Sequence, residues 1–417
     1  MDVQDYARNR EKSWIVLGCA WLIGFAMYCP ILCIPPIAFI IKEELRVSHA
    51  AVGLLFSLPV TVLVPLALPS GFLADRLGTK RAVGIGATVM AAGGLMRGMS
   101  DSYATLLALT FLYGVGFSII YPNLPKLVGL WFPREKVGLA TGVYTTGITM
   151  GAGISLAITL PLVFPLTGSI QGAFFFWSIP AVVAAALWWI LVRDPPLVRD
   201  PCDRASGANR DDRPSSSLWK NRNMWMIALM LFLNNVHYYT WSAWTPALMM
   251  MKGAPPDLAA LIASFRAWVG LPIIFLMPWA SYRVGVRKPF IWGSALLLAL
   301  ASWSAIYLPL SLGWPLMAAI SVGTAGTFPL ILAFPLEMLP NRSVGTASGA
   351  VLSIGYTGGL LGPWLAGHVV DSTGSLDLAL IFLGGAAMLW AWIGFSVPET
   401  GRKALNPVCS QPFDSPA

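Results

Sequence analysis

Long apolar segments follow one another along this chain, with short polar turns between them. A helix that crosses a membrane needs about 20 apolar residues, whereas a membrane-spanning strand needs only about ten. Because lipid offers no hydrogen-bond partners, segments of the longer kind have to be helices. The sequence therefore predicts an all-α membrane protein with twelve transmembrane helices, at residues 13–41, 49–74, 82–99, 102–131, 138–166, 170–193, 223–251, 257–281, 289–310, 313–339, 345–369 and 376–397.

The composition agrees with a protein embedded in a membrane. Hydrophobic residues make up 56% of the 417 positions and charged residues only 11%, less than half the charged fraction of an ordinary soluble domain. The net charge of +8 is not gathered on a polar domain, which argues against nucleic acid as a partner. Residues 1–12 lack the order of a cleavable signal peptide, so the first apolar segment is expected to remain as a span.

A constant spacing relates the two parts of the chain. Moving 207 positions along the sequence from Arg76 and Gly78 reaches Arg283 and Gly285. Breaker residues that repeat at one spacing between apolar spans indicate two equivalent halves. We expect six helices in residues 1–193, a cytoplasmic linker at 194–222 and six helices in 223–417 with a cytoplasmic tail. The same offset joins Lys80 to Arg287, Arg81 to Lys288, Gly116 to Gly323, Pro122 to Pro329 and Gly142 to Gly349.

Glycines recur at three- and four-residue spacing in the fifth and eleventh spans. Small residues at this spacing let neighbouring helices approach closely. We expect them to bring helices of opposite halves together and to let these helices slide, with static packing as the alternative. The glycines are Gly138, Gly142, Gly147, Gly151 and Gly153 in one span and Gly345, Gly349, Gly355, Gly358, Gly359 and Gly362 in the other.

The distribution of basic residues predicts an orientation. Most of the 27 Lys and Arg residues fall in turns on the side of the N-terminus, while Lys42, Arg46 and Lys252 fall on the other side. Cytoplasmic loops carry the excess of basic residues. Both termini are therefore expected in the cytoplasm, in a multi-pass protein of a bacterial or archaeal inner membrane.

Two basic residues lie inside predicted spans, where a charge is costly and usually functional. Arg266 lies near the middle of the eighth span, and its equivalent in the first half is Pro59. A guanidinium presents a planar fork that suits a carboxylate. The alternative is a structural arginine that binds backbone carbonyls of a kinked helix. For Lys126, a place on the substrate path and a side chain that snorkels to the surface are both open.

Acidic residues are missing from the membrane middle. Asp75 and Glu135 flank turns, Glu337 lies near a span end, and the remaining acids near spans lie at their outer ends. An exporter of cations usually needs a deep carboxylate. A cavity whose deep charges are positive favours an anionic substrate instead.

A polar and aromatic cluster on the seventh span is the second candidate for the site. Asn234, His237, Tyr238 and Trp241 have spacings that place them on one helix face, so we expect them to line a cavity together. His237 either takes up a proton during transport or is a neutral, hydrogen-bonded ring. The other predicted wall residues are Tyr28, Tyr121, Tyr144 and Tyr356.

The turn from Gly71 to Arg81 resembles the loop between spans two and three of the major facilitator superfamily. We expect Gly71 to permit close helix approach and Asp75 to accept from a facing helix N-terminus. With Arg76, Asp75 would brace the outward-facing state across the halves. The second repeat has Tyr282 where Asp75 would be, so this bracing is expected only in the first half. The predicted gating residues are Gly71, Asp75, Arg76, Gly78, Lys80, Arg81, Arg283 and Gly285.

Other motifs resemble particular branches of that superfamily. Phe132-Pro133 followed by 138–145, with Tyr238-Tyr239 and 244–246, is similar to the cyanate and nitroimidazole transporters. The Trp131-Phe132-Pro133 turn and Arg266 are similar to carriers of oxalate, nitrate and monocarboxylates. The resemblance implies a twelve-helix carrier that works by alternating access.

Enzymatic motifs are missing from the sequence, which has no phosphate-binding Gly-Lys-Ser/Thr loop, no zinc spacing and no catalytic triad order. Cys29 and Cys33 are expected to pack rather than to bind metal, and no cofactor is expected. We expect a monomeric secondary active or facilitative transporter of a small anion such as a monocarboxylate, a dicarboxylate or cyanate, with a co-transported proton left open. The alternatives are an exporter of hydrophobic or cationic compounds and a non-transporting receptor on the same fold.

Overall fold

The computed structural model describes residues 3–132, 134–193, 221–338 and 344–400, and the regular elements in these ranges are helices. The first half contains α1 (Val3–Leu32), η1 (Pro35–Ile37), α2 (Ala38–Leu45), α3 (His49–Leu77), α4 (Thr79–Arg97), α5 (Tyr103–Ile120), α6 (Asn123–Trp131), α7 (Arg134–Ile158), η2 (Thr159–Val163), α8 (Phe164–Thr167) and α9 (Ile170–Leu191). The second contains α11 (Arg222–Met251), α12 (Pro256–Val284), α13 (Lys288–Tyr307), η3 (Leu310–Leu312), α14 (Gly313–Ala325), α15 (Thr327–Met338), α16 (Val344–Thr373) and α17 (Asp377–Ser396).

Each predicted span corresponds to one of these helices or to consecutive ones, which confirms the all-α prediction. Within the described ranges, nine helical stretches are long and apolar enough to cross a membrane. The other three predicted spans correspond to α4, α11 and α16, which are less apolar than their neighbours. α4 starts with the basic sequence Thr79-Lys80-Arg81, α11 carries the polar cluster, and α16 is rich in glycine. Most of the predicted linker, residues 194–220, lies outside the described residues.

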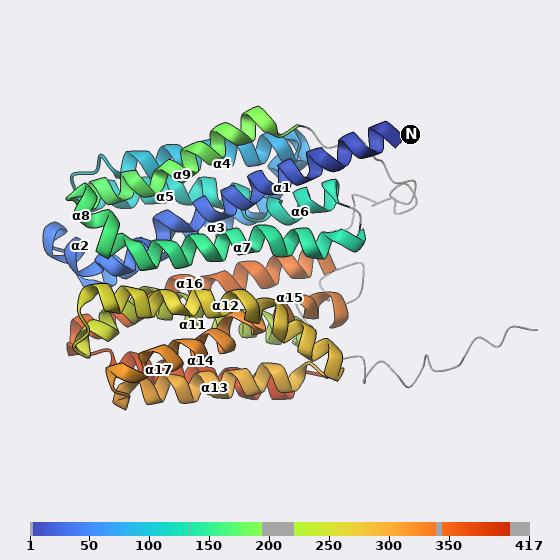
Figure 1. The fold of residues 1–417 in the computed structure, drawn as a ribbon. Coiled ribbons are helices and arrows are strands. Elements are labelled where there is room, and N and C mark those ends of the chain that lie inside the picture. The colour runs from blue at the N-terminus through green and yellow to red at the C-terminus, as the bar shows by residue number, and fades with distance from the viewer. Residues whose placement is uncertain (1–2, 133, 194–220, 339–343, 401–417) are drawn as a thin grey trace, which may run out of the picture.

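The two halves lie side by side as parallel groups of helices, with α1–α9 in one and α11–α17 in the other (Figure 1). Equivalent helices pair in each half, because α1 packs along α7 just as α11 packs along α16. The turns after α3 and α12 are also equivalent, and each uses a glycine with positive φ, Gly78 at 87° and Gly285 at 81°. We call the end with these turns and the N-terminus the basic end, and the end with α2 and α8 the opposite end.

Glycines set the closest helix contacts within each half. A Cβ at Gly151 would lie 2.3 Å from the backbone oxygen of Phe25, and one at Gly358 would lie 2.2 Å from that of Phe232. The prediction that these glycines join opposite halves is thus only partly right. Contacts across the halves occur at Gly142, which faces the Phe275 ring, at Gly153, which faces Ala267, and at Gly359, which faces Val60 as well as Tyr239.

Replacing Gly151 by alanine is expected to destabilise the folded protein by about 1–3 kcal/mol, because the new methyl group meets backbone that cannot move aside. Gly293→Ala in α13 is the matched control, since a Cβ there meets nothing within 4 Å. At that control site alanine should leave stability unchanged or raise it, because alanine is the better helix former. Thermal unfolding of the two purified variants checks this difference in sign, and equal melting temperatures would contradict it.

A second buried arginine, Arg97, lies next to Pro30, a proline inside α1. The Tyr113 hydroxyl donates to the Met27 carbonyl oxygen at 2.6 Å, close to this proline. Arg97 is fully buried, donates from Nη1 to the Pro30 oxygen at 3.0 Å, and lies 4.1 Å from the centre of the Phe174 ring. Arg97 therefore has the role of a structural arginine that binds the main chain of a proline-containing helix.

Candidate functional site

Two adjoining cavities lie between the halves. The smaller, about 100 Å³, is called here the Arg266 chamber, and the larger, about 520 Å³, the apolar chamber. They share the lining residues Tyr121, Thr145, Ile148, Ile274, Phe328 and Tyr356, so the same side chains form part of the wall of each. The Arg266 chamber is also lined by Tyr28, Asn234, Asn235, Tyr238, Tyr239 and Thr324, and the apolar chamber by Leu63, Val64, Tyr144, Phe275, Leu332 and Leu352, among others.

Arg266 lines the smaller chamber and is held by side chains from its own half. It is 4% exposed and donates from Nη2 to the Ser242 hydroxyl of α11. The Tyr238 ring lies over the guanidinium, 4.5 Å from its carbon to the ring centre, which is cation–π distance. The backbone oxygen of Arg266 accepts from the Ser321 hydroxyl at 2.7 Å, which ties α12 to α14.

The charge of Arg266 is not neutralised by a carboxylate in the described part of the chain. The ion pairs recorded there join His49 to Asp371 and Lys126 to Asp75, and no Asp or Glu lines either chamber. A buried charge without a counter-charge is costly. Among the described residues, the recorded side-chain hydrogen bond of Arg266 uses one N–H of Nη2, so the remaining N–H groups can donate to an anion that enters the chamber.

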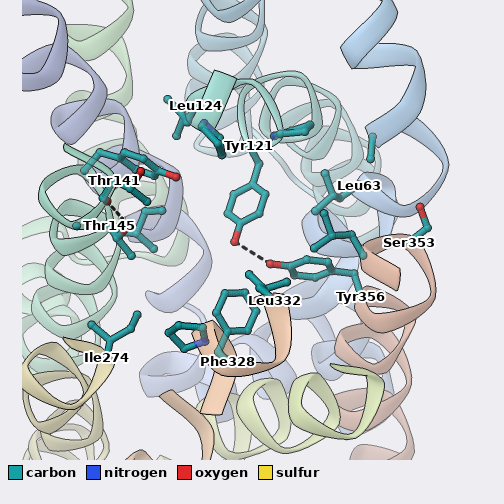
Figure 2. Close-up of a pocket in the computed structure, with 18 of the residues that line it drawn as sticks. Leu63, Tyr121, Leu124, Thr141, Thr145, Ile274, Phe328, Leu332, Ser353 and Tyr356 are labelled. Atoms are coloured by element: carbon teal, nitrogen blue, oxygen red, sulfur yellow. Dashed lines mark hydrogen bonds between the residues drawn. The ribbon is translucent and has the colours of Figure 1, made fainter. Parts of the chain in front are cut away.

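Tyrosines from both halves meet at the centre of the molecule. The Tyr121 and Tyr356 hydroxyls are 2.7 Å apart, and Figure 2 shows the two side chains meeting at their hydroxyl groups. Deeper in the protein, the Tyr28 and Tyr239 hydroxyls are 3.4 Å apart. Both pairs join the first half to the second, so they lie where the two halves have to separate.

The α11 cluster divides between two faces, which corrects the prediction that four of its residues line the cavity together. Asn234 and Tyr238 line the Arg266 chamber, as do Asn235 and Tyr239. At 100° per residue, the centre of this face lies about 130° from His237, so the histidine points away from the chamber.

His237 and Trp241 lie instead against α17. The His237 ring nitrogens lie 2.7 and 2.9 Å from the Leu233 and Leu383 carbonyl oxygens. A neutral ring can donate to only one of these oxygens, whereas a protonated ring can donate to both. Trp241 lines a separate small cavity next to Leu380 and Leu383. Sequence spacing gives the angle between residues of a helix but not which face the cavity occupies.

Lys126 lies outside both chambers. Its ammonium group pairs with the Asp75 carboxylate of α3, and both side chains are well exposed, at 37% and 64%. Lys126 therefore contacts the surface turn and not the Arg266 chamber, which corrects the reading that placed it on the substrate path. The partner of Asp75 is thus a side chain of its own half, Lys126, whereas the sequence had suggested a facing helix N-terminus as the partner.

The other predicted gating residues show few close contacts in this conformation. A Cβ at Gly71 would meet nothing within 4 Å, so the expectation of a close helix approach there is wrong for this state. Arg76 is exposed, and Arg283 lies over the ring of its neighbour Trp279, at 5.2 Å. Lys80 accepts at its backbone oxygen from the Trp188 indole, 2.9 Å away.

The chamber walls contain residues that the sequence suggested and others that it did not. Tyr28, Tyr144, Tyr356 and Tyr121 lie in the chamber walls, as their placement in the sequence suggested. Ser242, which binds Arg266, went unnoticed although it lies one helical turn after Tyr238. That spacing alone could have predicted that Ser242 lies on the same helix face as Tyr238. The other residues missed were Asn235, Tyr239, Thr324 and Phe328.

At the opposite end the halves are joined by one carboxylate. The Asp371 oxygens of α16 accept from the backbone N–H groups of His49 and Ala50, at 2.8 and 2.9 Å, and the His49 Nδ1 is also 2.8 Å away. These N–H groups belong to the first turn of α3, where the helix dipole favours a negative charge. On its other side, His49 Nε2 lies 3.2 Å from the ammonium nitrogen of Lys42, which can only donate.

The pH dependence of this contact follows from the Asp371 carboxyl. Partial burial raises its pKa, but the N–H groups of Ala50 and His49 and the His49 ring lower it by more, so the pKa lies below its usual value. Because the pKa of the carboxyl is lowered by the contact, the ionised carboxylate stabilises the joined state at every pH above the ordinary pKa of about 3.9. This stabilisation is lost as the pH falls through the lowered pKa.

We therefore expect the opposite end to stay closed from neutral pH down to about pH 4 and to open only below it. The His49 ring contacts the carboxylate and Lys42 contacts the far nitrogen of that ring, and neither replaces the carboxylate as the acceptor of the two backbone N–H groups. The distance between spin labels at Arg46→Cys and Asp377→Cys, followed with pH in a cysteine-free background, measures the opening. An opening step near neutral pH would contradict Asp371 as its origin.

Comparison with known proteins places the chain among membrane carriers. The family model described as Major Facilitator Superfamily matches residues 16–265, more than half of the chain. The relative named uncharacterized transporter YycB, from Bacillus subtilis, is 27% identical over 396 residues, covering 92% of this chain and 93% of that protein. The cyanate transport protein CynX of Escherichia coli is 26% identical over 358 residues, covering 85% and 89%.

Among solved structures, the D-xylose-proton symporter has a TM-score of 0.78 at 15% identity, covering 93% of this chain and 98% of that one. At this identity the likeness concerns the fold alone. The relative that transports cyanate agrees with the resemblance drawn from Phe132-Pro133 and Tyr238-Tyr239.

Proposed function

The chain belongs to the major facilitator superfamily, and we propose that it transports a small anion by alternating access, with Arg266 as the residue that binds the anion. The observation that carries the proposal is a guanidinium in a central chamber whose described lining holds no carboxylate. An embedded cation of this kind is kept where it meets a negatively charged ligand. Arg97 is also buried without a carboxylate partner among the described residues, so what distinguishes Arg266 is its position in the lining of the chamber.

Two further observations support this assignment. Arg97 already fills the role of a structural arginine, which binds the main chain of α1 without facing either chamber. Arg266 instead binds side chains and lines open space. The similarity to a relative named for cyanate, itself an anion, supports the same substrate charge.

The conformation fits one state of an alternating-access cycle. Hydrogen bonds between the described residues of the two halves lie at the centre and at the opposite end, while the apolar chamber lies on the side of the basic end. If the basic end is cytoplasmic, as its Lys and Arg content indicates, the state is inward-facing. The halves would then rock about the Arg266 chamber to expose it to the other side.

Counterflow in proteoliposomes tests the proposed function. Vesicles loaded with one unlabelled anion are given the same anion with a radiolabel, using cyanate, acetate and succinate in turn, and ethidium as a cationic probe. Protein-dependent, saturable exchange of at least one anion is expected, with no movement of ethidium. Movement of ethidium without exchange of any anion would contradict the proposal and would favour an exporter of cationic compounds.

A further inference from the structure

The Arg266 chamber offers a ligand one positive charge. Among the described residues that line either chamber, Arg266 is the only Lys, Arg or His. One N–H of Nη2 donates to Ser242, and its second N–H, together with the N–H of Nε or of Nη1, forms an edge that can hold the two oxygens of one carboxylate. A second negative charge on the ligand would meet only neutral side chains in the described lining and would be desolvated without a second cation. The site therefore fits a monoanion and disfavours a dianion.

The walls next to the guanidinium are mainly flat rings. Tyr238 covers one face of Arg266, and its ring meets the Tyr239 ring edge to face, with centres 5.1 Å apart. The Tyr121 ring is stacked on Phe117 with centres 5.5 Å apart and meets Tyr356 at 5.9 Å. These mutual contacts hold the rings in place before a ligand binds. Aromatic pairs gain energy beyond the area they bury, so fixed rings favour a ligand that is itself a flat ring.

The space beyond the guanidinium is apolar. Ile148, Ile274 and Phe328 line both chambers, and the larger chamber continues along Leu63 and Leu332. Figure 2 shows Ile274, Phe328 and Leu332 around the same space as the Tyr121 and Tyr356 rings. A ligand that reaches Arg266 from this side therefore needs a charged group at one end and an apolar body at the other.

We infer that the site binds a monocarboxylate whose carboxylate is attached to a flat, largely apolar ring. The carboxylate pairs with the free edge of Arg266, and the ring lies among the tyrosines and Phe328. This inference rests on the proposed function and narrows it from small anions in general to one chemical class.

Isothermal titration of the purified protein at pH 8 tests the class with five probes. Benzoate has the charge and the flat ring, cyclohexanecarboxylate has the charge on a puckered ring, and acetate has no ring. Phthalate adds a second charge, and benzamide has the ring without a charge. We expect benzoate to bind about 2- to 12-fold more tightly than cyclohexanecarboxylate. Acetate should bind more weakly than both, and phthalate and benzamide should show no binding.

Two pairs of variants assign the effects to residues. Arg266→Ala should abolish the binding of benzoate and of cyclohexanecarboxylate, whereas Arg193→Ala, an exposed arginine at the end of α9, should leave both unchanged. Phe328→Leu should reduce benzoate binding to the level of cyclohexanecarboxylate without changing the latter. Phe334→Leu on the same helix is the matched control, because Phe334 is buried outside both chambers.

The outcomes separate the two proposals. Binding of acetate or phthalate as tight as that of benzoate, still dependent on Arg266, would overturn the ring inference and leave the anion carrier in place. Benzamide that binds as well as benzoate would overturn the requirement for a charge. Failure of every anion to bind in an Arg266-dependent way would count against the proposed function itself.

Discussion

Anion counterflow should fall by at least about 30-fold when Arg266 is replaced by lysine, although the positive charge is kept. A hydrogen bond to a charged group contributes about 1.5–3 kcal/mol and a cation–π contact about 0.5–1 kcal/mol, and each 1.4 kcal/mol is a tenfold change in binding. Lysine presents a point charge on a flexible stem and cannot give the two parallel N–H groups of the guanidinium. It also loses the flat stacking of the guanidinium on Tyr238.

Initial rates of anion exchange in proteoliposomes, at equal protein content, measure this effect. Arg193→Lys provides the matched control, because Arg193 is exposed at the end of α9. The melting temperature of each variant in detergent shows whether the fold is intact. An Arg266→Lys protein that is folded and exchanges anions at the parental rate would remove Arg266 from the binding site.

The second large effect is expected at the opposite end, where Asp371→Asn should favour the open arrangement of the two halves. The carboxylate accepts from two backbone N–H groups and the His49 ring, whereas an asparagine amide has one oxygen and turns an NH₂ toward one of these donors. The contact is partly exposed, so we expect a shift of about 1–2 kcal/mol, or roughly 5- to 30-fold in the ratio of open to closed molecules.

Spin labels at Arg46→Cys and Asp377→Cys again report the separation, and the open population should appear at neutral pH in the Asp371→Asn protein. Asp257→Asn serves as control, because Asp257 is an exposed acid in the first turn of α12, at the same end. Identical distance distributions for Asp371→Asn and the parent would show that the carboxylate does not hold the halves together.

The helices could be predicted from the sequence because lipid imposes one length and one backbone pattern on every span. The break between α5 and α6 at Tyr121-Pro122 and that between α14 and α15 fall inside predicted spans, because apolar residues predominate on both sides of each break. The equivalence of the halves was visible in the 207-residue spacing, and it appears in the structure as the α1–α7 and α11–α16 pairs.

Fewer residues of the site than of the helices could be predicted from the sequence. A lone arginine in an apolar span is conspicuous, and Arg266 does line the central chamber. Lys126 was also a basic residue inside a predicted span, but it pairs with Asp75, 51 positions away in the chain. A contact of this kind depends on how α3 and α6 pack, which the sequence does not show. His237 lies on the wrong face of α11 for the same reason. The Asp371 contact joins residues more than 300 positions apart and leaves no local pattern.

The two tyrosine pairs at the centre have a consequence for the speed of the conformational cycle. Tyr28 with Tyr239 and Tyr121 with Tyr356 are neutral hydroxyl contacts, and water entering from either side can replace each of them with little loss of energy. An ion pair at the same place would leave two bare charges in the membrane interior at every turnover. With hydroxyls there, the empty protein can reset without such a barrier.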